Sequence, residues 1–278
     1  MLKLKHLFFS YAHKPLFSDL NLNLEKGGVC GLLGKNGSGK TTLLKLIAGL
    51  AFADQGHAQV MGRDPSQRSP AFLENIYFLP EEMYLPRLTA TQYRQCYATF
   101  YPRFDHDFFK KALKEFDLPS DKLLTSLSYG QKKKFLLSFG FAANTKLLIL
   151  DEPTNGLDIP SKAQFRKLLA SNISENRLFI ISTHQVHDVE NIIDSVVVLD
   201  EGKIIFHESM MEMSKKLDFV LESSVPGEAF YYEKRLWGYA AVMSNKSEVD
   251  SQIDLELFFN AVLTNKTQIQ QLFDEVKS

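Results

Sequence analysis

A glycine-rich loop between an apolar run and a helical pattern is the feature that most constrains the fold of this chain. Val29–Leu33 is a compact apolar run typical of a strand buried on both faces, and Gly34–Thr42 follows it directly as GKNGSGKTT. Apolar residues then recur at helical spacing up to Leu50. Glycines in such a loop let consecutive backbone N–H groups point at one anion, beside the positive end of the helix. The order strand, loop, helix therefore predicts a phosphate-binding loop in an α/β fold.

The loop matches the pattern G-x-x-x-x-G-K-S/T at each of its fixed positions. We expect Lys40 to reach the β- and γ-phosphates of a nucleotide as a point charge, and the Thr41 hydroxyl to ligate Mg²⁺. A flexible surface turn would explain the glycines alone, but not the strand and the helix on either side. The other expected nucleotide contacts in this loop are Gly34, Asn36, Gly37, Ser38, Gly39 and Thr42.

Two later apolar runs end in polar residues that suit the same site. The run Leu147–Leu150 ends in Asp151 and Glu152, and the run Leu178–Ser182 ends just before His184. Strands of this kind separated by helices predict a parallel sheet, and ligands bind such sheets at the carboxyl ends of the strands. We therefore expect Asp151 to hold Mg²⁺ and Glu152 to orient and deprotonate an attacking water.

Composition limits the classes of partner. Lysine and arginine number 32 against 33 acidic residues, so the net charge of −1 gives no electrostatic reason to expect binding to nucleic acid. The run Lys132–Lys134 is accordingly interpreted as a solvated helix face, and no nucleic-acid partner is expected. No apolar run approaches the length of a membrane-spanning helix, and the 2 cysteines suit a reducing compartment. The sequence thus predicts a cytoplasmic protein.

The chain divides into two predicted parts, 1–210 and 211–278. In the first, residues from about 86 to 143 carry helical periodicity and are interpreted as a helical insertion into the sheet domain. Two apolar runs on either side of Asp200–Gly202 predict a hairpin that closes the core. Beyond it, short strand patterns are followed by a helix capped by Asp254 and a second helix from about Thr267, which together predict a small α+β extension.

Several motifs in order make residues 1–210 resemble the ATP-binding subunits of ABC (ATP-binding cassette) transporters. Leu127–Gln131, LSYGQ, resembles the family signature LSGGQ with Tyr129 in place of the first glycine. Asn155–Asp158 resembles the loop after the catalytic glutamate, and His184 stands where the family has its switch histidine. Tyr11, 23 residues before Gly34, stands where the family stacks an aromatic ring on adenine.

The resemblance implies a fold and a catalytic arrangement. The fold is a P-loop NTPase (RecA-like) core of the α/β class with an antiparallel β part, the helical subdomain and the small C-terminal α+β extension. Glu152 and His184 are the implied catalytic residues, and ATP with Mg²⁺ is the implied ligand, the metal being held by Thr41, Asp151 and Glu81. In the family, ATP bound to one cassette is covered by the signature of a second. Here the implied covering residues are Ser128, Gly130 and Gln131, with Asp158 linking the two copies.

The function implied by the resemblance is ATP hydrolysis that drives transport through a separate membrane permease. The expected partners are that permease and a second ATPase subunit, giving a homodimer peripheral to the cytoplasmic face of the cell membrane. The C-terminal extension, which includes Asp254–Phe259, points to exporter-type systems. One alternative is a soluble ABC ATPase that remodels a protein or nucleic-acid complex. The other is an ATP-gated regulatory subunit that hydrolyses slowly.

Two segments leave questions open. Glu81 stands where the family usually has glutamine. An ionised carboxylate accepts hydrogen bonds and can ligate Mg²⁺, but it cannot donate to the γ-phosphate or to water, so coupling or turnover is expected to differ. Met83–Leu88 falls where the family forms a groove for a helix of the membrane subunit. An apolar patch suits that role, and equally suits a place in the helical-subdomain core.

Overall fold

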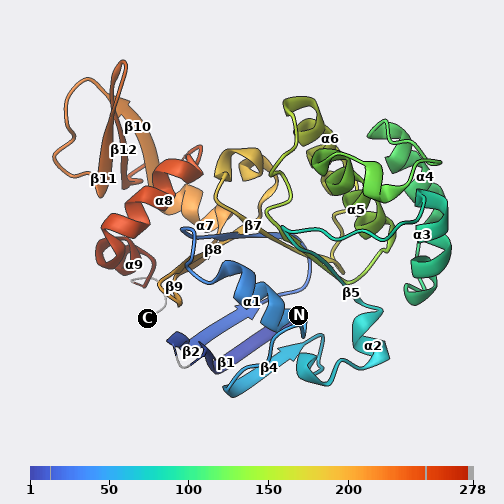
Figure 1. Cartoon of the computed structure of the whole chain (residues 1–278). Coiled ribbons are helices and arrows are strands. Elements are labelled where there is room, and N and C mark those ends of the chain that lie inside the picture. Colours follow the sequence, from blue (N-terminus) through green and yellow to red (C-terminus); the bar gives the residue numbers. More distant parts are fainter. Residues whose placement is uncertain (13, 248, 275–278) are drawn as a thin grey trace.

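The computed structural model describes residues 1–12, 14–247 and 249–274, and within these ranges the strands form three sheets (Figure 1). The largest sheet has six strands in the order β5-β6-β7-β3-β8-β9, all parallel except β9, which pairs antiparallel with β8. This confirms the predicted parallel sheet and the predicted hairpin at Glu201 and Gly202. The strands are β3 (Val29–Leu33), β5 (Ile76–Leu79), β6 (Leu147–Asp151), β7 (Leu178–Thr183), β8 (Ser195–Asp200) and β9 (Lys203–Ser209).

A second sheet, in the antiparallel order β2-β1-β4, lies across helix α1 (Lys40–Ile47) from the large sheet (Figure 1). Its strands are β1 (Leu2–Tyr11), β2 (Lys14–Leu24) and β4 (Gln55–Val60). The antiparallel β part that the resemblance implies therefore includes two long strands near the N-terminus. β4 has mostly exposed side chains and no apolar alternation, so its sequence does not predict a strand.

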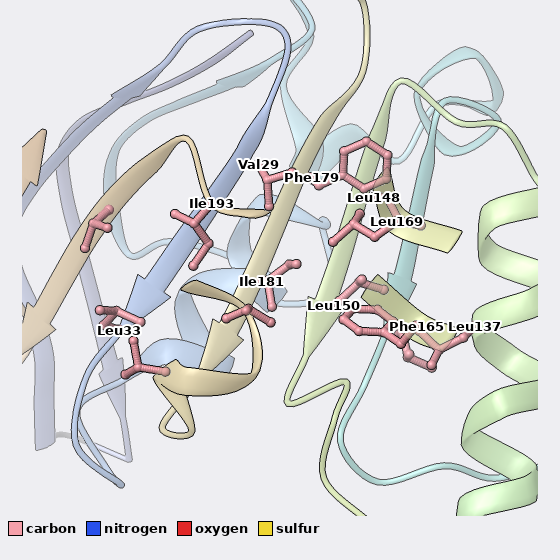
Figure 2. Packing of buried hydrophobic residues seen from close by; sticks show 14 of the residues in the cluster. Val29, Leu33, Leu137, Leu148, Leu150, Phe165, Leu169, Phe179, Ile181 and Ile193 are labelled. Atoms are coloured by element: carbon pink, nitrogen blue, oxygen red, sulfur yellow. The ribbon is translucent and has the colours of Figure 1, made fainter. Parts of the chain in front are cut away.

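Alternate residues of the large sheet belong to two separate cores, as the period of two in a strand requires. One face packs on α1 and the small sheet through residues such as Leu32, Ile149 and Ile180. The opposite face packs on the helices α5 (Tyr129–Ala142) and α6 (Ile159–Ala170). Figure 2 shows part of this second core: Leu148 and Leu150 lie beside the helix residues Leu137, Phe165 and Leu169, and Val29, Leu33 and Ile193 lie farther from them in the same cluster.

The segment from about 86 to 143 is helical, as predicted. It contains α3 (Ala90–Tyr97), α4 (His106–Glu115) and α5, and it forms the right-hand side of the molecule in Figure 1. A short helix α2 (Pro70–Leu73) precedes it. Aromatic rings form the core of this part: the ring of Tyr93 lies edge-on to the rings of Phe135 and Phe139, with centroids 5.1 Å apart in both pairs. These contacts fix α3 against α5.

The C-terminal part lies on the opposite side of the molecule (Figure 1). Asp254 caps its longer helix by accepting from the Leu257 N–H at 2.9 Å, as predicted. The ring of Phe206 on β9 packs against Phe258 and Phe273 at 4.8 and 5.1 Å, so this part shares a core with the large sheet. The division into 1–210 and 211–278 stays a prediction. The elements are α7 (Met210–Lys216), β10 (Leu217–Glu222), β11 (Tyr231–Arg235), β12 (Gly238–Ser244), α8 (Leu255–Thr264) and α9 (Lys266–Asp274).

Among the helices in the described ranges, none combines the length and the apolar character needed to span a bilayer.

Candidate functional site

A cavity of about 560 Å³ opens at the carboxyl ends of the parallel strands. It unites the loop after β3 with the residues that follow β5, β6 and β7, which is where ligands bind in sheets of this class. The lining residues are Asn36, Gly37, Gly39, Lys40, Thr41, Thr42, Glu81, Glu152, Asn155 and His184. Nine of these ten residues were predicted from the sequence as site residues, and Asn155 is the exception.

The loop holds Lys40 folded back over its own backbone. The Lys40 ammonium donates to the carbonyl oxygens of Gly34 at 2.6 Å and Lys35 at 3.2 Å. Burial lowers the pKa of Lys40, and the nearby carboxylates of Glu152 and Asp151 oppose that shift. A Cβ on Gly34 would lie 2.4 Å from the backbone oxygen of Leu199, so only glycine fits there. The buried cation thus faces the cavity from a tightly packed turn.

Thr41 and Asp151 meet as predicted. The Thr41 hydroxyl donates to Oδ2 of Asp151 at 2.8 Å, and the Asp151 side chain is buried at the end of β6. Its other oxygen, Oδ1, accepts a short hydrogen bond from the hydroxyl of Ser182. Ser182 was not predicted as a site residue; it faces Asp151 because the two residues pair in register across β6 and β7. A hydroxyl beside a carboxylate is the oxygen donor set that suits Mg²⁺.

Glu152 is held on both its side chain and its backbone. Its Oε1 lies 2.8 Å from Nδ1 of His184, and its side chain is 7% exposed. Its φ of +46° is in the left-handed region, which residues other than glycine seldom adopt. The Glu152 N–H donates to the carbonyl and hydroxyl oxygens of Ser182, at 3.1 and 3.2 Å. The predicted acidic residue and the predicted histidine are therefore in direct contact.

Glu81 faces the same cavity and takes part in an amide network. The Asn155 side-chain amide donates to Oε1 of Glu81 at 3.1 Å, and Gln185 donates to Oδ1 of Asn155 at 3.3 Å. The hydroxyl of Tyr129 donates to the backbone oxygen of Glu81 at 3.1 Å. The two positions at which this chain departs from the family pattern, Glu81 and Tyr129, are thus hydrogen-bonded to each other.

The interpretation of Lys132–Lys134 as a solvated helix face is wrong for Lys133. Its side chain is fully buried, and its ammonium donates to the backbone oxygen of Glu152 at 2.7 Å. Burial lowers the pKa of Lys133 to about 8, against the opposing effect of Glu81, Glu152 and Asp151. A run of three lysines predicts a solvated face because lysine is seldom buried. Here the middle lysine points inward, toward the end of β6.

The signature residues lie outside the cavity that Lys40 lines. Ser128 caps α5 by accepting from the Gln131 N–H at 3.2 Å, and the Gln131 side chain accepts from the Ser128 N–H at 3.0 Å. Gly130 lies against the loop after Glu152, where a Cβ would come within 2.9 Å of the Gly156 oxygen. The structure therefore presents Ser128, Gly130 and Gln131 at a helix N-terminus separate from the loop of the same chain.

Tyr11 and Asp158 also lie near the predicted elements. The Tyr11 hydroxyl is 3.2 Å from the Thr42 hydroxyl, and its ring is half exposed beside the loop. Asp158 caps α6 by accepting from the Ser161 N–H at 3.1 Å, and the hydrogen bonds from Ser161 lower the pKa of Asp158.

The segment Met83–Leu88 combines both of its expected environments. Met83 and Leu85 pack against the core of the helical part, whereas Tyr84 between them is 91% exposed. The alternation places one aromatic side chain at the surface between two packed side chains.

Comparison with known proteins identifies the family. A family profile described as "ABC transporter" matches residues 17–155. The chain is 31% identical over 206 residues to the ABC transporter ATP-binding protein YtrB of Bacillus subtilis (strain 168), covering 73% of this chain and 70% of that protein. The chain belongs to the ABC transporter family. As an ABC ATPase, it is an ATP-binding and ATP-hydrolysing subunit of a transporter.

Other relatives support the same assignment. The ABC ATPase is 30% identical over 248 residues to the lantibiotic transport ATP-binding protein SrtF of Streptococcus pyogenes, covering 84% of this chain and all of that protein. Its fold matches a solved ATP-binding subunit of an ABC transporter with a TM-score of 0.70 and 24% identity, over 77% of this chain and 91% of that one. A dimeric ATP-binding cassette bound to ADP and Pi matches with a TM-score of 0.66 and 21% identity, over 75% and 98% of the two chains. These relatives favour the transport ATPase over the two alternatives.

Proposed function

We propose that the cavity at the strand ends binds ATP together with Mg²⁺ and that each residue there has the role expected from the sequence. The observation that carries this proposal is the convergence of Lys40, Thr41, Glu152 and His184 on one cavity, with Asp151 bonded to Thr41. Lys40 is the cation for the β- and γ-phosphates. The exposed ring of Tyr11 beside Thr42 supports stacking on the adenine.

Thr41 and Asp151 hold Mg²⁺ in this proposal, and Glu81 on the same cavity is the third oxygen ligand. The bound ion supplies positive charge that neutralises the phosphates. Ser182 keeps Asp151 oriented, because its hydroxyl occupies the carboxylate oxygen that Thr41 does not use. Hydrogen bonds of this kind fix the orientation of ligating carboxylates.

Glu152 takes the proton from the attacking water, and His184 holds the carboxylate in place. The 2.8 Å contact between the two side chains supports this division of roles. The backbone N–H of His184 points at the second carboxylate oxygen at 3.4 Å. A carboxylate held from two sides is restricted in orientation, as proximity catalysis requires.

Each active site is completed by a second copy of the chain. The Ser128 end of α5 lies outside the cavity of its own chain, and the N-terminus of a helix attracts phosphate. Asp158 lies near the start of α5, because its Oδ1 is 4.0 Å from the Nζ of Lys134 on that helix. This position supports a role for Asp158 at the contact between copies. In a closed homodimer, the signature of one copy covers the ATP of the other.

A separate membrane permease is the partner that dimer closure drives, with this chain peripheral on the cytoplasmic face of the cell membrane. The exposed Tyr84, between the packed residues Met83 and Leu85, supports a contact for that permease. Export is the proposed direction, since the chain is also 31% identical over 210 residues to the SkfA peptide export ATP-binding protein SkfE of Bacillus subtilis (strain 168), over 73% of this chain and 87% of that protein.

A mixing experiment tests the shared site. Lys40→Ala removes the phosphate cation and Ser128→Arg blocks the signature, so either variant alone should release little phosphate. In an equal mixture, half of the dimers carry one intact site, and activity should recover to about a quarter of that of the unmodified protein. Two copies of the same variant, mixed as the control, should remain inactive. No recovery in the mixture contradicts a site shared between copies.

A second experiment tests the partner. The tagged chain is extracted with its membranes in detergent and the co-purifying proteins are identified. We expect a polytopic membrane protein, and its release by a Tyr84→Glu variant that still binds ATP. A soluble complex in its place would support the remodelling alternative.

A further inference from the structure

The fully buried lysine of the signature helix contacts the residue proposed as the catalytic base. Lys133 lies two residues after the last signature residue, Gln131, and its Nζ donates to the backbone oxygen of Glu152 at 2.7 Å. The acceptor is a neutral carbonyl, although a buried ammonium is usually paired with a carboxylate. The contact therefore joins two elements to which the proposed function assigns roles in hydrolysis.

The backbone of Glu152 needs support at this point. Its φ of +46° lies in the region that residues other than glycine seldom adopt, and such a conformation persists only where the surroundings fix it. Ser182 holds the N–H of this residue from β7, at 3.1 Å to its carbonyl oxygen. Lys133 holds the carbonyl group from α5. The two hydrogen bonds thus hold the N–H and the C=O of Glu152 from two different elements, β7 and α5.

The surroundings keep the Lys133 ammonium in place. The Tyr129 ring lies 5.4 Å from the Lys133 nitrogen, within the range of a cation–π interaction. The same ring packs on Gly156, where a Cβ would come within 2.6 Å of it, and its hydroxyl donates to the Glu81 oxygen. Tyr129 therefore connects the start of α5 to two loops, one that contains Glu81 and one that contains Gly156.

We infer that Lys133 is a positioning residue, which holds the backbone of Glu152 so that its carboxylate stays against His184 and aims into the cavity. The inference rests on the proposed role of Glu152 as the base. Because Lys133 belongs to the helix that begins at the signature, a displacement of this helix is transmitted directly to the Glu152 backbone. Lys133 is not among the residues that line the cavity.

Removal of the donor tests the inference. Lys133→Met keeps the length and most of the volume of the side chain but cannot donate, so the Glu152 peptide loses one of its two supports. We expect kcat for phosphate release to fall at least about tenfold, while the Kd for Mg-ATP changes less than about threefold. Lys133→Gln retains an N–H donor and should restore kcat to within about threefold of the unmodified protein. Lys132→Met, at the partly exposed neighbouring position, is the matched control and should leave kcat unchanged.

A double variant separates positioning from stability. If Lys133 acts through Glu152, adding Lys133→Met to Glu152→Gln should lower the residual phosphate release no further. Single-turnover phosphate release with the full chain in excess over ATP gives the rates even where turnover is slow. Lys133→Ala, which also removes the N–H donor, replaces Lys133→Met if the latter does not fold.

The outcomes distinguish this inference from the proposed function. A folded Lys133→Met or Lys133→Ala protein with unchanged kcat overturns the inference, and so does a Lys133→Gln protein as impaired as these. Neither result contradicts the proposed function if Glu152→Gln still abolishes phosphate release. Unchanged release in Glu152→Gln would overturn the proposed base, and with it the positioning role.

Discussion

The imidazole of His184 and the carboxylate of Glu152 are in contact across the loops that follow two adjacent parallel strands, with Nδ1 2.8 Å from Oε1. Each residue comes directly after the last residue of its strand. The parallel pairing of β6 and β7 therefore creates the contact between residues that are 32 positions apart. The pair faces the cavity that also contains Lys40.

Replacing the base should separate binding from hydrolysis. Glu152→Gln keeps the size of the side chain and the oxygen nearest His184, but an amide cannot accept the proton from water. We expect phosphate release to fall at least about 100-fold, with Mg-ATP binding retained. Light scattering after gel filtration with ATP should then show accumulated dimers. Release at the rate of the unmodified protein would exclude Glu152 as the base.

The unusual Glu81 offers a prediction about coupling. Glu81→Gln introduces the residue that the family usually has. The new side chain keeps an oxygen for the Asn155 amide, which in the unmodified protein donates to Oε1 of Glu81 at 3.1 Å. Mg-ATP affinity should stay within about threefold, because Lys40 and the loop provide the main grip on the phosphates. Turnover should change, because the amide can donate a hydrogen bond where the carboxylate cannot. A loss of affinity measured by calorimetry would show that the position is wrongly assigned.

The core shared with the C-terminal part makes a prediction about stability. Phe258 is fully buried against Phe206 of β9, so Phe258→Ala should lower the free energy of unfolding by about 3–5 kcal/mol. Phe52→Ala, at a ring that is 54% exposed, should change it by less than about 0.5 kcal/mol. Urea unfolding followed by circular dichroism measures both. Equal effects of the two variants would contradict the shared core.

The cysteines give a prediction about pH. Burial raises the pKa of Cys30 to about 12, so its thiol stays protonated and unreactive at pH 8. Because the shift is upward, raising the pH from 8 to 9 should still leave very little Cys30 thiolate. The exposed Cys96 should react with a disulfide reagent in the native protein, and Cys30 only after denaturation. Cys96→Ser should abolish native labelling; fast labelling of that variant would contradict the burial of Cys30.

The sequence allowed prediction of the parts of the site whose signal is local. The loop Gly34–Thr42 and the run that ends in Asp151 and Glu152 each contain, within a few residues, a strand pattern and the polar groups that follow it. The structure joins them as expected, with Thr41 bonded to Asp151. The helical part, the hairpin at Glu201 and the cap at Asp254 were predicted for the same reason, since periodicity and turn chemistry are short-range properties.

Contacts set by tertiary structure could not be predicted in this way. Ser182 is an ordinary strand residue until β6 and β7 pair in one register and bring it opposite Asp151. Lys133 has the sequence context of a solvated lysine, and only the packing of α5 against the end of β6 turns it inward. The contact of Tyr129 with Glu81 joins residues 48 positions apart. Neither residue carries a local signal for the other.

Calorimetric titration with Mg-ATP tests the central claim most directly. The unmodified protein should bind the nucleotide, and Lys40→Ala should weaken binding at least about tenfold, because it removes the buried cation that faces the cavity. Lys35→Ala, at an exposed position in the same loop, is the control and should bind normally. Absence of Mg-ATP binding by the folded protein, or unchanged binding by Lys40→Ala, would contradict the account.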